Sequence, residues 1–130
     1  MIEWNLPIKT VSEANCSEHW IEKRKRHKNQ QKIVWYVWQT QDVEILLPCH
    51  IKLIRLGKRK LDSDNLPMSF KYIRDEIASL LFPEKIIKVH DEKRGKRYRS
   101  KGQCDSSTQI TWEYDQKISK TYGIIVQFNF

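Results

Sequence analysis

Several features that would assign this chain to a familiar class are missing from its sequence. Its three cysteines, Cys16, Cys49 and Cys104, are irregularly spaced, which predicts no disulfide framework and matches no zinc-finger pattern. The longest apolar stretch, residues 43–56, contains charged residues and Pro48, so it cannot span a bilayer. The first residues lack the basic start and apolar run of a signal peptide. We therefore expect a cytoplasmic protein with no membrane partner.

Motifs for several common chemistries are also missing. The chain has only four glycines and contains neither a glycine-rich phosphate loop nor a dinucleotide fingerprint. It has no Ser-His-Asp order typical of nucleophilic catalysis, and no internal repeat. We expect no small-molecule cofactor.

What the sequence does contain is positive charge. The 130 residues carry a formal net charge of +8 and fit a single domain, residues 1–130. Two basic runs, residues 23–28 and 93–101, lie close to the aromatic residues Trp20 and Tyr98. Lysine and arginine runs of this kind favour contacts with nucleic-acid phosphates.

Hydrophobic periodicity predicts a mixture of strands and helices. Apolar residues alternate, as is typical of strands, in four segments: residues 2–6, 49–56, 110–114 and 122–130. Spacings of three and four predict one helix from Leu66 to Leu81, capped by Asn65 and ended by Pro83. Residues 19–41 are ambiguous, because their first half favours helix and residues 33–38 favour strand. We expect a turn at residues 115–123 and a long polar connection at residues 84–104.

Two aspartates separated by one residue, Asp62 and Asp64, lie between a predicted strand and the predicted helix. In extended backbone such residues point to the same side, and neighbouring carboxylates repel unless a cation lies between them. The pair therefore predicts part of a magnesium site, and Asp105 is the best candidate for a third ligand. The alternative is that Asp64 and Asn65 cap the helix while Asp62 forms a turn.

Lys71 follows Asp64 by two helical turns, so its ammonium group could stabilise charge on a reacting phosphate. The alternative for this lysine is an exposed ion pair with Asp75, four residues later.

Four motifs occur in a fixed order along the chain. Residues 12–15, Ser-Glu-Ala-Asn, precede His19-Trp20, and residues 61–66, Leu-Asp-Ser-Asp-Asn-Leu, open an amphipathic helix with Lys71 and Arg74-Asp75. Asp105 then precedes the strand at residues 110–114. This order resembles the RusA family of Holliday junction resolvases, which are small magnesium-dependent endodeoxyribonucleases common in phages and prophages.

The resemblance implies an α+β fold: a small mixed β-sheet with helices packed on one side, assembled as a homodimer. It makes residues 19–40 a helix. It also implies that Asp62, Asp64 and Asp105 bind Mg²⁺, with Mn²⁺ as an alternative, and activate water. Two departures are visible: Met68 stands where the family often has a lysine, which Lys71 would replace, and Leu61 stands where it often has an arginine.

We therefore expect a metal-dependent endonuclease that resolves four-way DNA junctions by paired phosphodiester hydrolysis in recombination and repair. Its predicted DNA contacts are polar and basic residues: Asn15, Arg24, Lys25, Arg26, Lys58, Arg59, Lys60, Asn65, Arg97 and Arg99. The main alternative is a DNA-binding module without catalysis, whose aspartates only cap and brace the helix. An RNA-directed protein is a second alternative, and a membrane-surface protein is disfavoured because no basic amphipathic helix of the required pattern is present.

Overall fold

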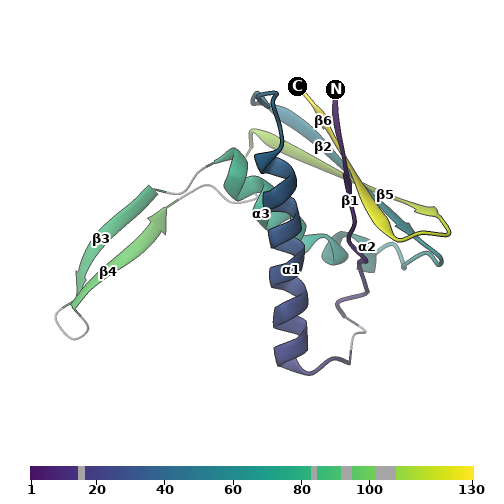
Figure 1. Cartoon of the computed structure of the whole chain (residues 1–130), viewed down its shortest axis with the longest axis horizontal. Helices are drawn as coiled ribbons and strands as arrows, with labels where there is room; N and C mark the ends of the chain where they lie inside the picture. Colours follow the sequence, from purple (N-terminus) through teal and green to yellow (C-terminus); the bar gives the residue numbers. More distant parts are fainter. Residues whose placement is uncertain (15–16, 83–84, 92–94, 102–107) are drawn as a thin grey trace.

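The computed structural model describes residues 1–14, 17–82, 85–91, 95–101 and 108–130, with the backbone alone for residues 85–101. The elements, in chain order, are β1 (Ile2–Leu6), α1 (Trp20–Gln39), β2 (Cys49–Gly57), α2 (Asn65–Ser69), α3 (Lys71–Leu81), β3 (Lys85–Asp91), β4 (Gly95–Lys101), β5 (Ile110–Ile118) and β6 (Gly123–Asn129). Figure 1 shows their arrangement. None of the described helices is long and apolar enough to cross a membrane.

Four of the strands form one mixed sheet, in the order β1-β6-β2-β5. β2 runs parallel to β5, with Cys49 opposite Ile110, and antiparallel to β6. The four strands predicted from alternation are therefore confirmed. The last two are not paired with each other, because β2 lies between them. The predicted turn at residues 115–123 is too long, since β5 continues to Ile118.

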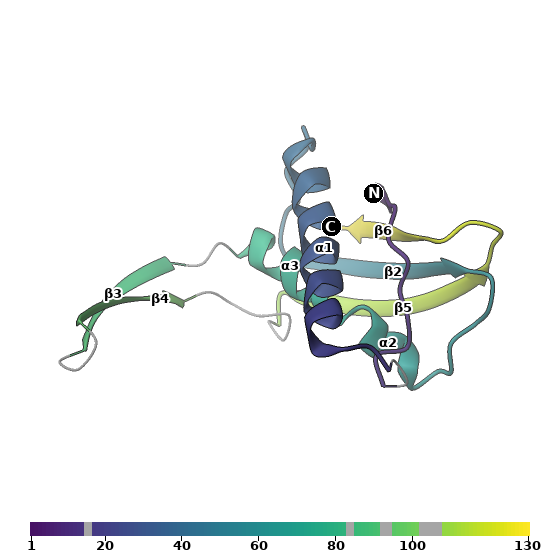
Figure 2. The ribbon, with the colours of Figure 1, turned by 60° about the horizontal axis from the view of Figure 1, so that its bottom comes forward.

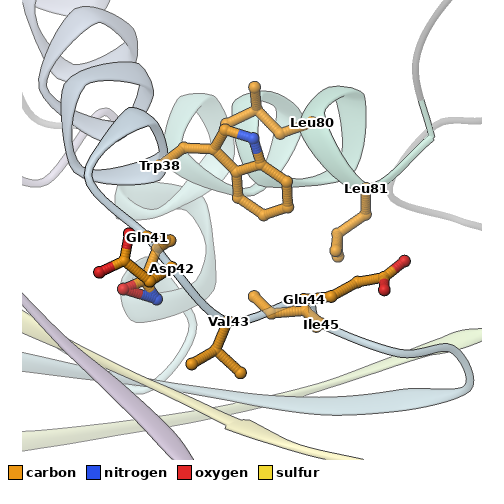
Figure 3. A pocket seen from close by; sticks show the side chains of 8 residues that line it. All are labelled: Trp38, Gln41, Asp42, Val43, Glu44, Ile45, Leu80 and Leu81. Carbon is orange, nitrogen blue, oxygen red and sulfur yellow. The ribbon is translucent and has the colours of Figure 1, made fainter.

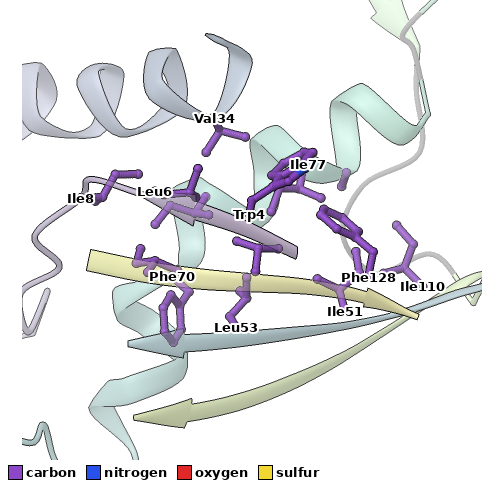
Figure 4. Packing of buried hydrophobic residues seen from close by; sticks show 14 of the residues in the cluster. Trp4, Leu6, Ile8, Val34, Ile51, Leu53, Phe70, Ile77, Ile110 and Phe128 are labelled. Carbon is purple, nitrogen blue, oxygen red and sulfur yellow. The ribbon is translucent and has the colours of Figure 1, made fainter. Parts of the chain in front are cut away.

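The helices lie on one face of this sheet, as Figures 1 and 2 show. The core between the two layers is formed by alternate residues of each strand, among them Trp4, Ile51, Leu53 and Phe128 (Figure 4). The opposite face carries mainly polar side chains, including the ion pairs His50–Glu113 and Lys52–Asp115. The protein is thus a small α+β fold with a four-stranded mixed sheet.

The helix that the family resemblance implies for residues 19–40 is confirmed as α1, and the strand alternative is wrong. His19 caps its start, because the imidazole Nδ1 accepts a hydrogen bond from the Ile21 backbone N–H at 3.3 Å. Helical spacing places Val34 in the core with no exposed surface while Trp35 faces solvent. Packing against β1 and α3 therefore overrides the strand propensity of this aromatic segment.

The single helix predicted for residues 66–81 is in fact two helices, α2 and α3, separated by Phe70. The Phe70 N–H bonds to the Pro67 carbonyl at 3.1 Å, which closes α2 with a tight turn. The Phe70 ring is fully buried and stacks on Tyr114 at 5.8 Å between centroids. The predicted cap is also wrong, because Asp64 is the N-cap residue and Asn65 is the first residue of α2.

The long connection predicted for residues 84–104 contains an antiparallel hairpin, β3–β4, in which Lys85 lies opposite Lys101 and Asp91 opposite Gly95. Its first strand is rich in β-branched residues, which favour extended backbone. The many lysines and arginines around these β-branched residues favoured the prediction of a polar connection over that of a strand. Figures 1 and 2 show the hairpin extending away from the four-stranded sheet.

We predict that Phe70→Ala lowers the free energy of unfolding by about 3–5 kcal/mol, because it leaves a cavity where α2 meets α3. Urea unfolding followed by circular dichroism would measure the loss. Met68→Ala is the matched control, since Met68 is 50% exposed and its truncation should change stability by about 0.5 kcal/mol or less. Equal losses in the two variants would contradict this role for Phe70.

Candidate metal and nucleic-acid site

The segment that carries Asp62 and Asp64 is a turn, and the expectation of extended backbone there is wrong. β2 ends at Gly57, and residues 58–61 separate it from the aspartates. The Asp62 carbonyl accepts hydrogen bonds from the backbone N–H groups of Asn65 and Leu66, at 2.9 and 3.0 Å. Asp64 has helical backbone angles, φ −79° and ψ −25°. The start of α2, rather than the pleat of a strand, therefore positions both carboxylates.

A side chain from β5 attaches this turn to the sheet. The Gln116 side-chain oxygen accepts a hydrogen bond from the Leu61 N–H at 2.9 Å, and its amide nitrogen donates to the Leu61 carbonyl at 2.8 Å. We call this pair of bonds the Gln116 clamp. The sequence alone does not predict this clamp. The available signal was a glutamine that continues the alternation of Ile110, Trp112 and Tyr114 in β5.

The carboxylates of Asp62 and Asp64 are exposed, and neither forms a hydrogen bond or ion pair with a described residue. Although Asp64 is the N-cap residue, its side chain makes no capping hydrogen bond. The capping alternative therefore does not account for Asp64. Two exposed carboxylates of this kind suit a hard cation such as Mg²⁺.

The described residues do not complete a metal site. No group of three or more histidine, cysteine, aspartate or glutamate side chains among them is placed to hold a metal ion. Asp105, the predicted third ligand, lies outside the described residues, and so does Asn15. The described part of the chain thus contributes at most the Asp62–Asp64 pair.

A pocket of about 370 Å³ adjoins Asp64 and is lined by Asp64, Pro67, Met68, Lys71 and Arg74. Met68 and Lys71 thus open onto the same space. The ion pair foreseen as the alternative for Lys71 is also present, at 3.8 Å from Asp75. Both of its side chains are more than one-third exposed, so the pair is weak.

Arg74 also lines the pocket, although the sequence predicts it neither as a metal ligand nor as a DNA contact. Its guanidinium carbon lies 5.0 Å from the ring centroid of Trp112 and 5.4 Å from that of Tyr114. These aromatic rings of β5 hold the arginine beside the pocket. The site therefore combines carboxylates from one turn with cations from the first two turns of α3.

Most of the predicted DNA contacts that the structure describes are accessible. Arg24 and Lys25 are exposed on α1, residues 58–60 are exposed between β2 and the aspartates, and Asn65 is half-buried. Arg97 and Arg99 lie in β4, where only the backbone is described.

Arg26 was predicted to contact DNA, but its guanidinium is instead bonded to two glutamates of this chain. Its guanidinium forms two hydrogen bonds with the Glu13 carboxylate, at 2.6 and 2.9 Å, and a third with Glu18 at 2.9 Å. Only 17% of its side chain is exposed. A run of basic residues in the sequence does not show which of them have carboxylate partners in the fold. Arg26 therefore has a structural role.

The cluster around Arg26 ties the N-terminal segment to two helices. His27 contacts the same Glu13 carboxylate at 3.1 Å and stacks on Tyr72 of α3, with 3.5 Å between ring centroids. Burial raises the pKa of Glu13, but the hydrogen bonds from Arg26 and His27 outweigh it and lower the pKa overall. The hydrogen bonds with Glu13 raise the pKa of Arg26.

A second pocket, of about 420 Å³, lies between the C-terminal ends of α1 and α3 (Figure 3). Trp38, Leu80 and Leu81 form its apolar wall, and Asp42 and Glu44 come from the segment after α1. It contains none of the residues predicted for metal or DNA, so it is separate from the site described above.

The RusA family was an expectation drawn from the order of motifs in the sequence. Comparisons of the chain with protein-family models, with curated proteins and with solved structures found no match. Membership of the RusA family therefore stays a prediction.

We predict that Glu13→Gln lowers the free energy of unfolding at pH 7 by about 2 kcal/mol, because it leaves Arg26 with one carboxylate fewer. The Glu13 pKa is lower in the folded protein than its ordinary value of 4.5, so its stabilisation is present above that pH. The stabilisation is lost as the pH falls through the lowered folded pKa. The difference between the two proteins should therefore shrink below about pH 4.5.

Urea unfolding at a series of pH values would measure this difference. Glu22→Gln is the control, because its pair with Lys25 is 3.7 Å long and exposed, and should contribute about 0.5 kcal/mol or less. A difference for Glu13→Gln that does not depend on pH would contradict the expected titration.

Proposed function

We propose that this chain is a metal-dependent endodeoxyribonuclease of the RusA type that acts on four-way junctions and other branched DNA. The observation that carries the proposal is the unused pair of carboxylates, Asp62 and Asp64. An aspartate at an N-cap position normally bonds the first N–H groups of its helix, and Asp64 does not. Its carboxylate remains available next to the cationic side chains of Lys71 and Arg74.

The donor set fits magnesium, with manganese as an alternative. Asp62, Asp64 and Asp105 would hold the ion, since carboxylate oxygens are its preferred protein ligands. When bound, the ion would supply an activated water and stabilisation of the departing oxygen. The chain's own cations would bind and orient the phosphate: Lys71 as a compact charge, and Arg74 as a planar fork held by its aromatic neighbours.

The pocket lies alongside the first half of β5, because Arg74 packs beside Trp112 and Tyr114. The chain just before β5 is held at the start of β2, since the Gln109 carbonyl accepts a hydrogen bond from the Cys49 N–H at 2.9 Å. The role proposed for Asp105 rests on the sequence and its family resemblance alone.

The exposed basic residues would bind the phosphates of the substrate DNA. Arg24, Lys25 and residues 58–60 are exposed in a protein with net charge +8, which favours a polyanion. Paired incisions in a four-way junction need two sites related by symmetry, so we propose a homodimer.

A DNA-binding module without catalysis is the second candidate. It is favoured by two observations: the described residues bring only two carboxylates together, and Lys71 is paired with Asp75. In that case binding would not depend on divalent ions and no substrate would be nicked.

We predict that Asp64→Asn lowers junction cleavage by about 100-fold or more while junction binding is retained, because the change removes a metal ligand and no basic residue. The measurement is incubation of a labelled four-way junction and a matched linear duplex with Mg²⁺ or with a chelator. Asp42→Asn, an exposed aspartate at the other pocket, should cleave normally. Retained cleavage by Asp64→Asn would refute the site, and no nicking by the unmodified protein would favour the second candidate.

Asp105→Asn should cause a loss of cleavage similar to that of Asp64→Asn, if Asp105 is the third ligand. Glu113→Gln is the matched control, because this exposed glutamate lies on the opposite face of the sheet and bonds to His50. Normal cleavage by Asp105→Asn would show that it is not a ligand and would leave only the Asp62–Asp64 pair in the proposed site.

A further inference from the structure

Arg55, near the end of β2, is a buried charge with only neutral partners. It is 5% exposed. Its Nε donates to the Thr10 hydroxyl at 2.9 Å, and its two terminal nitrogens donate to the carbonyls of Arg59 and Thr10, at 2.7 and 3.3 Å. No carboxylate of the described residues pairs with it. Burial lowers the pKa of this guanidinium, and an uncompensated buried charge is costly.

Arg55 also lines a pocket of about 440 Å³ whose other charged residues, Lys9, Lys58 and Arg59, are all basic. Two of these cations lie near the Tyr122 ring, with Nζ of Lys9 at 4.5 Å and Nζ of Lys58 at 5.9 Å from its centroid. None of the residues that line this pocket is acidic. Its positive charge is therefore not balanced from within the pocket.

Ser12 provides a second and independent sign of a missing ligand. Ser12 lines the same pocket, and its hydroxyl is buried yet has no hydrogen-bond partner in the described part of the chain. Buried polar atoms without partners are rare, because each one loses its bonds to water. A ligand that accepts hydrogen bonds would satisfy this hydroxyl and neutralise the arginine together.

Gly57 makes room for the guanidinium. A Cβ atom at this position would lie 2.7 Å from one terminal nitrogen of Arg55 and 3.0 Å from its central carbon. The guanidinium is held by three hydrogen bonds, so it could not move aside without breaking them. Glycine at the end of β2 is thus required by the position of the arginine.

We propose that this pocket binds a backbone phosphate of a nucleic acid. A guanidinium fork matches phosphate oxygens, lysines add compact charges, and the Ser12 hydroxyl donates one further bond. Leu61, the residue before Asp62, also lines the pocket, so the bound phosphate would belong to the strand held at the carboxylate pair. The placement of that strand rests on the proposed function, whereas phosphate binding itself requires neither metal nor cleavage.

The test is NMR spectroscopy of the isotope-labelled full chain in the presence of a chelator. Inorganic phosphate, compared with sodium chloride at equal ionic strength, should shift the Arg55 Nε–H signal and the amide signals of Ser12 and Gly57 in a saturable way. A short thymidine oligonucleotide without terminal phosphates should shift the same signals and displace the phosphate, because its backbone presents the same group.

Substitutions assign the binding to this pocket. Lys58→Gln and Ser12→Ala should each weaken phosphate binding about fivefold. Arg55→Lys should weaken it about tenfold or more, because the fork is lost. Gly57→Ala keeps every charge but displaces the guanidinium, so it should also weaken binding. Lys32→Gln is the matched control, since this lysine lies 5.8 Å from the Tyr36 ring on α1, with no buried arginine beneath it.

Three results would overturn the proposal: chloride and phosphate give the same shifts, Lys32→Gln weakens binding as much as Lys58→Gln, or the oligonucleotide leaves phosphate bound. Lys58→Gln and Ser12→Ala keep the test valid if Arg55→Lys fails to fold. The proposed nuclease activity fails separately. If the protein binds phosphate here but cuts no junction, the phosphate pocket is supported and the nuclease activity is refuted. If it cuts junctions but does not bind phosphate, the nuclease activity is supported and the phosphate pocket is refuted.

Discussion

Two hydrogen bonds between the Gln116 side chain and the backbone of Leu61 fix the part of the molecule on which the proposed chemistry depends. They join the segment after β2 to β5, its parallel neighbour, and so hold the start of α2 against the sheet. An amide side chain that uses both its donor and its acceptor on one residue's backbone restricts orientation as well as distance. Asp62 follows directly in the chain, so its position depends on that restraint.

The charges of the protein fall into two groups that the sequence does not distinguish. Glu13 and Glu18 are bonded to Arg26, and Asp115 is paired with Lys52. Asp62 and Asp64 have no such partner among the described residues. The exposed turn therefore has negative charge available for a cation, while the pocket around Arg55 has positive charge available for an anion. Leu61, the residue before Asp62, lines the pocket around Arg55 and so connects the two charged regions along the chain.

The sequence predicted the sheet well because one of its faces is buried. Alternation in β1, β2, β5 and β6 reflects a core on the helix side, and each of these strands was located from that pattern. The apolar stripe of residues 66–81 was also correct, since the tight turn at Phe70 keeps that ring in the core. The break itself depends on a contact with Tyr114, which is distant in the sequence, and local spacing cannot show it.

The candidate site was harder to predict because its geometry depends on partners. The two aspartates were found from their spacing, but the reason given for it, an extended backbone, does not apply to a turn at the start of α2. Arg26 was assigned to DNA because a run of basic residues does not reveal a carboxylate thirteen positions away. The opposite holds for Arg55, which lies in an apolar strand, so that the sequence does not mark it as a binding residue and only its neutral partners do. The pairing of the first strand with the last has a different consequence. Ile2 lies opposite Phe128, and within the described sheet β1 pairs with β6 alone, so β1 cannot join the sheet until residues 124–128 have been synthesised.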